Sequence, residues 1–291
     1  MPNIKLAKNP GCYAILPKLS KDALEKFVQD TPCIGLSGQF RWDDIQPKFK
    51  DFNSNLITDF LLLCDKFNKS SYLRIIGGKC SPNWVKEKND NKMPILWTCG
   101  YLDYWCDFIG EIGGKLEEYP VSCIAITGVG DKDGMELNTK GFNLRKKRKY
   151  SPSALTTAWI RCIDTFRWAF QSSDKFIALD RPLNNGFGID IINSIVSDCE
   201  SINIGIGANW LTAKKGKFLD IYNIITQSSE LIPTYFRELC SSRSSRFSGT
   251  FDSGVNIAVS CGASVLEVHK PDSHNLNSIE RANNLLGNSQ R

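Results

Sequence analysis

Carboxylates and tryptophans stand at the ends of apolar segments that we interpret as buried strands. The acidic side chains at these points are Asp131, Asp133, Glu136, Asp180, Glu238, Glu267 and Asp272. Hydrolysis of a glycosidic bond requires two carboxyl groups flanking the bond, one as an acid and one as a base or nucleophile. Carboxylates on facing strands could serve in this way, so glycoside hydrolysis is one chemistry that these residues allow.

Tryptophans close to the same strand ends add a candidate platform for sugar rings. They are Trp42, Trp84, Trp97 and Trp210. Indole faces would contact the apolar faces of a sugar ring while polar neighbours bind its hydroxyls. The substrate-binding residues that we select are Arg41, Trp42, Trp84, Asp180, Asn209 and Trp210. Core or rim packing is the alternative for each tryptophan, because large aromatic side chains are mostly buried.

Glu267 differs from the other carboxylates because it lies inside an apolar strand, Val265-Leu-Glu-Val268. A carboxylate buried there is costly unless it is paired or hydrogen-bonded. A catalytic role and a structural ion pair are therefore both open for this residue.

Eight strand-like apolar runs alternate with helix-like segments along the chain. The runs cover residues 12–16, 33–37, 72–76, 121–127, 175–179, 202–206, 231–236 and 264–268. The helical segments cover 21–28, 56–64, 101–118, 153–170, 189–199, 218–225, 251–261 and 276–286. This alternation predicts a (β/α)8 TIM barrel of the α/β class, formed by one domain over residues 1–291, and barrels of this kind typically need about 250 residues. An open doubly wound sheet is the alternative, because alternation alone does not show closure.

Long loops follow three of the predicted strands, at residues 38–53, 77–100 and 128–152. They come after the carboxyl ends of strands, which is the face where barrel active sites lie. We therefore expect the site beneath these loops. Pro233 makes the seventh strand the weakest of the eight, because proline cannot donate to a strand ladder.

Composition indicates a cytoplasmic protein without a cofactor. The formal net charge is +5, and we find neither a signal-peptide core nor an apolar run of roughly 18 residues that could span a membrane. The 11 cysteines are scattered singly and there are 2 histidines, which favours reduced thiols and no metal site. The basic run Arg145–Lys149 is better explained as a solvated loop than as a nucleic-acid patch.

Several short segments carry a family resemblance. They are residues 35–42, 72–84, 101–105, 126–128 with 135–136, and 266–269. Together they resemble barrels related to the beta-galactosidase-type glycoside hydrolases. The resemblance implies a carbohydrate substrate and a retaining mechanism, with an acid/base glutamate after the fourth strand and a nucleophilic glutamate after the seventh. Glu136 and Glu238 occupy those places here, and Glu267 is a rival for the second role.

The chain also departs from this family pattern. Those enzymes carry an Asn-Glu pair at the end of the fourth strand, whereas this strand ends Ile126-Thr-Gly128. A second hypothesis is therefore a barrel that binds carbohydrate, or acts as a scaffold, without a catalytic pair. An aldolase or isomerase is less favoured, because only Lys175 falls within the apolar runs and Gly262 precedes the last strand instead of following it.

Overall fold

The computed structural model describes residues 7–87, 94–130, 151–180, 187–214 and 219–288. Eight parallel strands follow one another around a closed barrel, and β1 pairs with β8 to complete it. The strands are β1 (Gly11–Ile15), β2 (Gly35–Arg41), β3 (Ser70–Ile76), β4 (Cys123–Ile126), β5 (Asp174–Ala178), β6 (Gly205–Leu211), β7 (Thr234–Glu238) and β8 (Val265–Val268). The predicted (β/α)8 barrel is confirmed, and the open sheet is excluded by the β1–β8 pairing.

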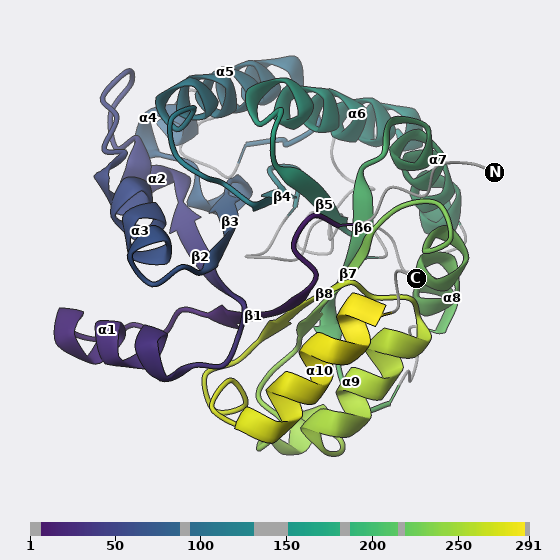
Figure 1. Ribbon diagram of the computed structural model, residues 1–291. Helices are drawn as coiled ribbons and strands as arrows, with labels where there is room; N and C mark the ends of the chain where they lie inside the picture. The colour runs from purple at the N-terminus through teal and green to yellow at the C-terminus, as the bar shows by residue number, and fades with distance from the viewer. Residues whose placement is uncertain (1–6, 88–93, 131–150, 181–186, 215–218, 289–291) are drawn as a thin grey trace.

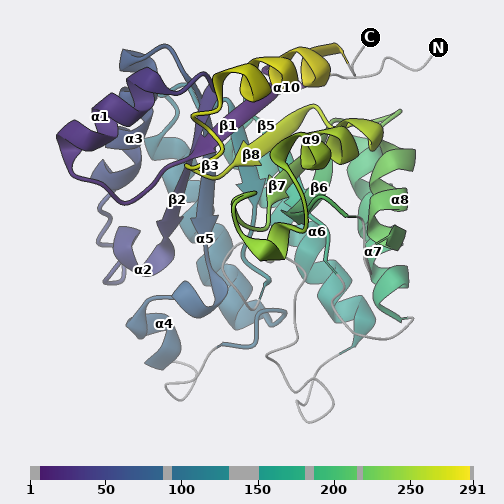
Figure 2. The same cartoon turned by 90° about the horizontal axis from the view of Figure 1, so that it is seen from below.

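Helices surround the strands (Figure 1). They are α1 (Lys21–Asp30), α2 (Trp42–Ile45), α3 (Asn55–Lys66), α4 (Asn83–Glu87), α5 (Cys99–Lys115), α6 (Pro152–Ala169), α7 (Phe187–Ile202), α8 (Leu219–Ser228), α9 (Phe251–Ser260) and α10 (Leu276–Asn288). The short helices α2 and α4 were not predicted and follow β2 and β3, within two of the long loops. Figure 2 shows them toward the end of the barrel opposite α10.

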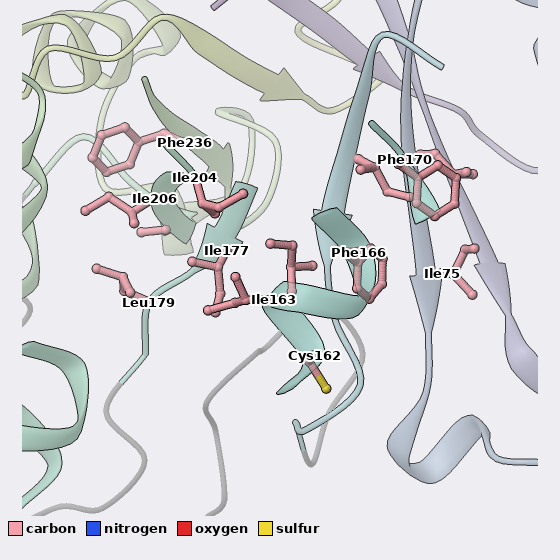
Figure 3. Close-up of a cluster of buried hydrophobic side chains, with 14 of the residues drawn as sticks. Ile75, Cys162, Ile163, Phe166, Phe170, Ile177, Leu179, Ile204, Ile206 and Phe236 are labelled. Carbon is pink, nitrogen blue, oxygen red and sulfur yellow. The ribbon is translucent and has the colours of Figure 1, made fainter. Parts of the chain in front are cut away.

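The main core lies between the outer face of the strands and the helices. Apolar residues three or four apart along α6, such as Trp159, Cys162, Ile163 and Phe166, are fully buried against it. This spacing places them on one helix face, as an amphipathic surface helix requires. Figure 3 shows part of this layer, where α6 side chains meet strand residues including Ile177.

Two differences between the predicted and observed strands have clear physical causes. The sixth strand was predicted at 202–206, but α7 continues to Ile202 and the chain turns at Asn203, whose φ is 57°, so β6 begins at Gly205. Asn accepts this left-handed backbone more readily than most residues. Pro233 precedes β7, and its carbonyl accepts a hydrogen bond from the Ile206 amide at 3.2 Å. Pro233 thus joins the pairing with β6 through its carbonyl, just before β7 begins.

Aromatic rings fill the lumen on the side where the strands begin. Tyr72 makes edge contacts with the rings of Tyr13, Phe176 and Tyr235, each at a centroid distance of 6.0 Å. Glycine makes room for them: a Cβ on Gly35 would lie 2.4 Å from the Tyr13 ring. Strand side chains alternate between faces. Arg74 of β3 and Arg237 of β7 lie two residues beyond Tyr72 and Tyr235, so they also face the lumen. Glu267 of β8 faces the lumen as well.

No helix within the described ranges is both long and apolar enough to cross a lipid bilayer.

Candidate functional site

A buried ion pair lies in the lumen, one layer above the aromatic rings. The Arg74 Nη2 donates to Glu267 Oε2 at 2.7 Å, and the Ser37 hydroxyl donates to Glu267 Oε1 at 2.5 Å. Both charged side chains are excluded from solvent, with 1% and 0% of their surfaces exposed. Burial alone would raise the pKa of the Glu267 carboxyl, but the Arg74 and Arg237 guanidiniums outweigh it and lower that pKa. Glu267 is therefore held ionised.

Polar side chains from two further strands extend this cluster. Arg74 donates to the Asn209 amide oxygen at 3.4 Å, and the Tyr235 hydroxyl donates to the same oxygen at 2.8 Å. The Arg74 guanidinium also lies 5.6 Å from the centroid of the Tyr72 ring. The Arg74–Asn209 contact joins residues 135 positions apart, on β3 and β6, so it reaches across the closed barrel. It places Asn209, a predicted binding residue, beside Glu267.

Arg237 adds a second guanidinium to the lumen. With the Gln39 amide oriented to present its oxygen, Arg237 Nη2 donates to it at 2.9 Å. Burial lowers the pKa of Arg237, and the charge of Glu267 opposes that effect. Gln39 is exposed and Arg237 is partly exposed. These two residues therefore offer hydrogen-bonding groups toward the mouth of the barrel.

Glu238 faces the opposite way from Arg237, toward the helices. It shares a face of β7 with Phe236, whose ring stacks on Tyr222 of α8 at 5.2 Å. Its Oε2 accepts a hydrogen bond from the His269 backbone amide at 2.7 Å. Burial, with the charge of Asp272 adding to it, raises the pKa of Glu238 well above its ordinary value. The structure thus separates Glu238 from the cluster around Glu267.

The end of β4 carries Thr127 and Gly128 where the family pattern has an Asn-Glu pair, and Trp105 packs against it. The Trp105 indole donates to the Thr127 carbonyl at 3.1 Å. Gly128 has a φ of 119°, and a Cβ there would lie 2.1 Å from Trp105 Nε1. A side chain at position 128 would therefore meet both strain and a clash. Glu136 lies outside the described residues.

Two of the tryptophans predicted as sugar platforms, Trp42 and Trp210, pack outside the lumen. Trp42 is fully buried, donates to Gln46 Oε1 at 2.9 Å and contacts the Trp105 ring at 5.1 Å. Trp210 is 4% exposed and makes an edge contact with Tyr222 at 5.5 Å. Packing explains both residues.

Three other predicted binding residues lie at separate places in the fold and differ in burial. Trp84 is half-buried and donates to the Gln46 carbonyl at 3.2 Å. Arg41 is exposed at the end of β2, where it pairs with Asp43 at 2.7 Å. Asp180 is buried just after β5. Of the predicted residues that the structure describes, only Asn209 and Glu267 come into one cluster.

A hollow lies on the flank of the barrel. It has a volume of about 790 Å³ and lies between α5, α6 and the segment that follows α2. Its lining includes Phe49, Trp84, Tyr104, Cys106 and Trp168. Within the described ranges, no three His, Cys, Asp or Glu side chains are grouped so as to hold a metal ion.

Sequence reasoning missed Arg74, Ser37 and Tyr235. Arg74 carried the same signal as Glu267, namely a charged residue inside an apolar strand, Tyr72-Leu-Arg-Ile-Ile76. Two opposite charges of this kind indicate a buried pair. Ser37 and Tyr235 carried no comparable signal, because both residue types are common in strands and cores.

Comparison with known proteins finds similarity in structure alone. No family model and no curated protein sequence matches the chain. Among solved structures, the endo-beta-1,4-glucanase B of Bacillus halodurans is 8% identical with a TM-score of 0.61, over 98% of this chain and 61% of that one. This chain therefore spans less than two thirds of that tri-modular protein.

Two xylanases are also similar. Xylanase 10B of Thermotoga petrophila, solved with xylobiose, is 12% identical with a TM-score of 0.58, covering 100% of this chain and 99% of that chain. The intracellular xylanase of Thermoanaerobacterium saccharolyticum is 11% identical with a TM-score of 0.59, covering 92% and 88%. These neighbours are barrel glycoside hydrolases. Likeness at such identities establishes the fold, and the beta-galactosidase type stays a prediction.

Proposed function

We propose that this protein is a glycoside hydrolase that acts on an oligo- or polysaccharide at the mouth of the barrel. The observation that supports it most is Glu267, a carboxylate kept ionised by Arg74 at the carboxyl end of β8. Glycoside hydrolysis needs such an anion to attack or stabilise a positively charged anomeric carbon. The barrels of the xylanases and the glucanase support the same choice of chemistry.

In this proposal Glu267 is the nucleophile or stabilising anion, and Glu136 is the acid that protonates the leaving oxygen. Asn209, Gln39 and Arg237 are the side chains that bind sugar hydroxyls. Because Glu267 has no exposed surface, a sugar has to displace a neighbouring side chain before contact. Gln39 is exposed and Arg237 is partly exposed, and these two are the side chains that we expect to move.

A substrate screen with a matched variant tests the proposal. The purified protein is incubated with aryl glycosides and with xylo- and cello-oligosaccharides, and the released sugar is quantified. A working acid contributes roughly 100- to 10,000-fold to the rate. We expect Glu136→Gln to lose activity by that factor while its circular dichroism spectrum is unchanged. Full activity in Glu136→Gln removes this residue from the mechanism.

A carbohydrate-binding barrel without catalysis is the second candidate, and Gly128 favours it. The chain has no glutamate at the end of β4, and a Cβ on Gly128 would clash with Trp105 in the present backbone conformation. This candidate requires that oligosaccharides bind in calorimetry while neither the wild type nor Glu136→Gln releases sugar. Turnover by the wild type excludes it.

A further inference from the structure

Helices α5 and α6 pack closely against each other on the flank of the barrel. A Cβ on Gly113 of α5 would lie 2.6 Å from the Ala169 carbonyl oxygen and 2.7 Å from its Cβ, so only glycine fits at this crossing. On Gly110 a Cβ would still lie 3.5 Å from the Trp168 ring. The close approach brings the facing side chains of the two helices into direct contact.

Two thiols meet across this interface. Cys106 of α5 and Cys162 of α6 lie between two contacts of these helices, the 2.7 Å Asp103–Arg161 ion pair and the Gly113–Ala169 crossing, and their thiols are within hydrogen-bonding reach of each other. Cys162 is fully buried, and Figure 3 shows it on α6 beside Ile163. Cys106 keeps 9% of its surface exposed and lines the 790 Å³ hollow. Cys106 is therefore the thiol of the pair that faces the hollow, and Cys162 lies deeper in the core.

The surroundings of Cys106 favour the thiolate. The hydrogen bond with Cys162, together with smaller effects of Thr165 and Arg161, outweighs the opposing effect of burial and lowers the pKa of Cys106 to about 7. The Arg161 guanidinium is fixed nearby by its 2.7 Å ion pair with Asp103. By contrast, burial raises the pKa of Cys33 and of Cys64 to about 12. Thiolate is the reactive form of cysteine.

We propose that Cys106 and Cys162 form an oxidation site, in which a hydroperoxide entering the flank hollow converts the thiol pair into a disulfide that links α5 to α6. Cys106 sulfur attacks one peroxide oxygen, so that an S–O bond forms, the O–O bond breaks and an alcohol or water leaves with the thiol proton. Cys162 sulfur then attacks the sulfenic sulfur and expels water. The two sulfurs lose two electrons in total, and the peroxide gains them.

The proposal is tested on the full chain with hydrogen peroxide. Reduced protein at pH 7 is treated with equimolar peroxide, free thiols are blocked, and peptides are mapped by mass spectrometry without reduction. We expect a linked peptide pair containing Cys106 and Cys162 that disappears on treatment with dithiothreitol. The rate of linkage should reach half its plateau near pH 7.

Single substitutions give the matched controls. Cys162→Ser should stop at a sulfenic acid on Cys106 that dimedone traps, and Cys106→Ser should leave Cys162 reduced. Cys99→Ser removes an exposed thiol from the same helix and should leave the linkage unchanged. Oxidation of Cys99 with Cys106 left reduced overturns the proposal. So does progress of Cys106 to sulfinic acid in the wild type without any linked peptide.

Discussion

Arg74 of β3 and Glu267 of β8 form an ion pair across the barrel lumen, with Arg74 Nη2 2.7 Å from Glu267 Oε2 and neither side chain open to solvent. The pair spans 193 positions of the sequence, so it forms only when the barrel closes. Removing one partner of a buried pair leaves an uncompensated charge, which is far more costly than losing an exposed pair.

Replacement of Arg74 by Met should therefore destabilise the fold by about 3–5 kcal/mol. The matched control is Arg41→Met, which breaks the exposed pair with Asp43 and should cost at most about 1 kcal/mol. Urea unfolding followed by circular dichroism measures both free energies of unfolding. Equal, small losses in the two variants are inconsistent with a buried pair. The double variant Arg74→Met/Glu267→Leu should recover much of the loss.

Glu267 should make the fold sensitive to acid. Its pKa in the folded protein is lowered, so its contribution to stability is present above the unfolded value of about 4.3 and is lost as the pH falls through the folded value. The free energy of unfolding should decline more between pH 6 and pH 3 in the wild type than in Glu267→Gln. Parallel curves for the two proteins would show that the folded state does not hold Glu267 ionised.

Glu238 should have the opposite effect on stability. Its pKa in the folded protein is raised, so the folded state retains a proton that the unfolded chain releases above about pH 4.3. The contribution of Glu238 to the free energy of unfolding is therefore lost as the pH rises from about 4.3 toward the pKa of Glu238 in the folded protein. Relative to the wild type, Glu238→Gln should become more stable as the pH rises from 4 to 7. A difference that stays constant with pH rules out the raised pKa.

Trp42 should be needed for stability and not for binding sugar. Trp42→Ala removes a fully buried indole, and such changes cost about 3–5 kcal/mol. Trp84→Ala removes a half-buried ring and should cost less. Thermal melting ranks the two variants, and calorimetry with xylo-oligosaccharides measures their affinity at a temperature where both are folded. A selective loss of affinity in Trp42→Ala would restore it as a sugar platform.

The fold was predictable because parallel strands covered on both sides are short apolar runs, and helices between them carry apolar residues three or four apart. Strand ends were less predictable: the apolar run 202–206 predicts a strand, but Asn203 turns the chain there. The site was harder still. Neighbouring residues of a strand face opposite sides, so a shift of one residue separates Arg237 from Glu238 and Asn209 from Trp210. Sequence proximity to a strand end could not tell lumen from outer wall.

Comparison of Glu267→Gln with Glu238→Gln on an oligosaccharide that the wild type hydrolyses tests the central claim most directly. Both changes remove a buried carboxylate by the same substitution, but only Glu267 lies in the lumen cluster. Initial rates of sugar release are measured at pH 6 on variants whose folding has been verified by circular dichroism. We expect Glu267→Gln to fall by at least about 100-fold and Glu238→Gln to stay within a few-fold of the wild type. Undiminished turnover in Glu267→Gln would contradict the account.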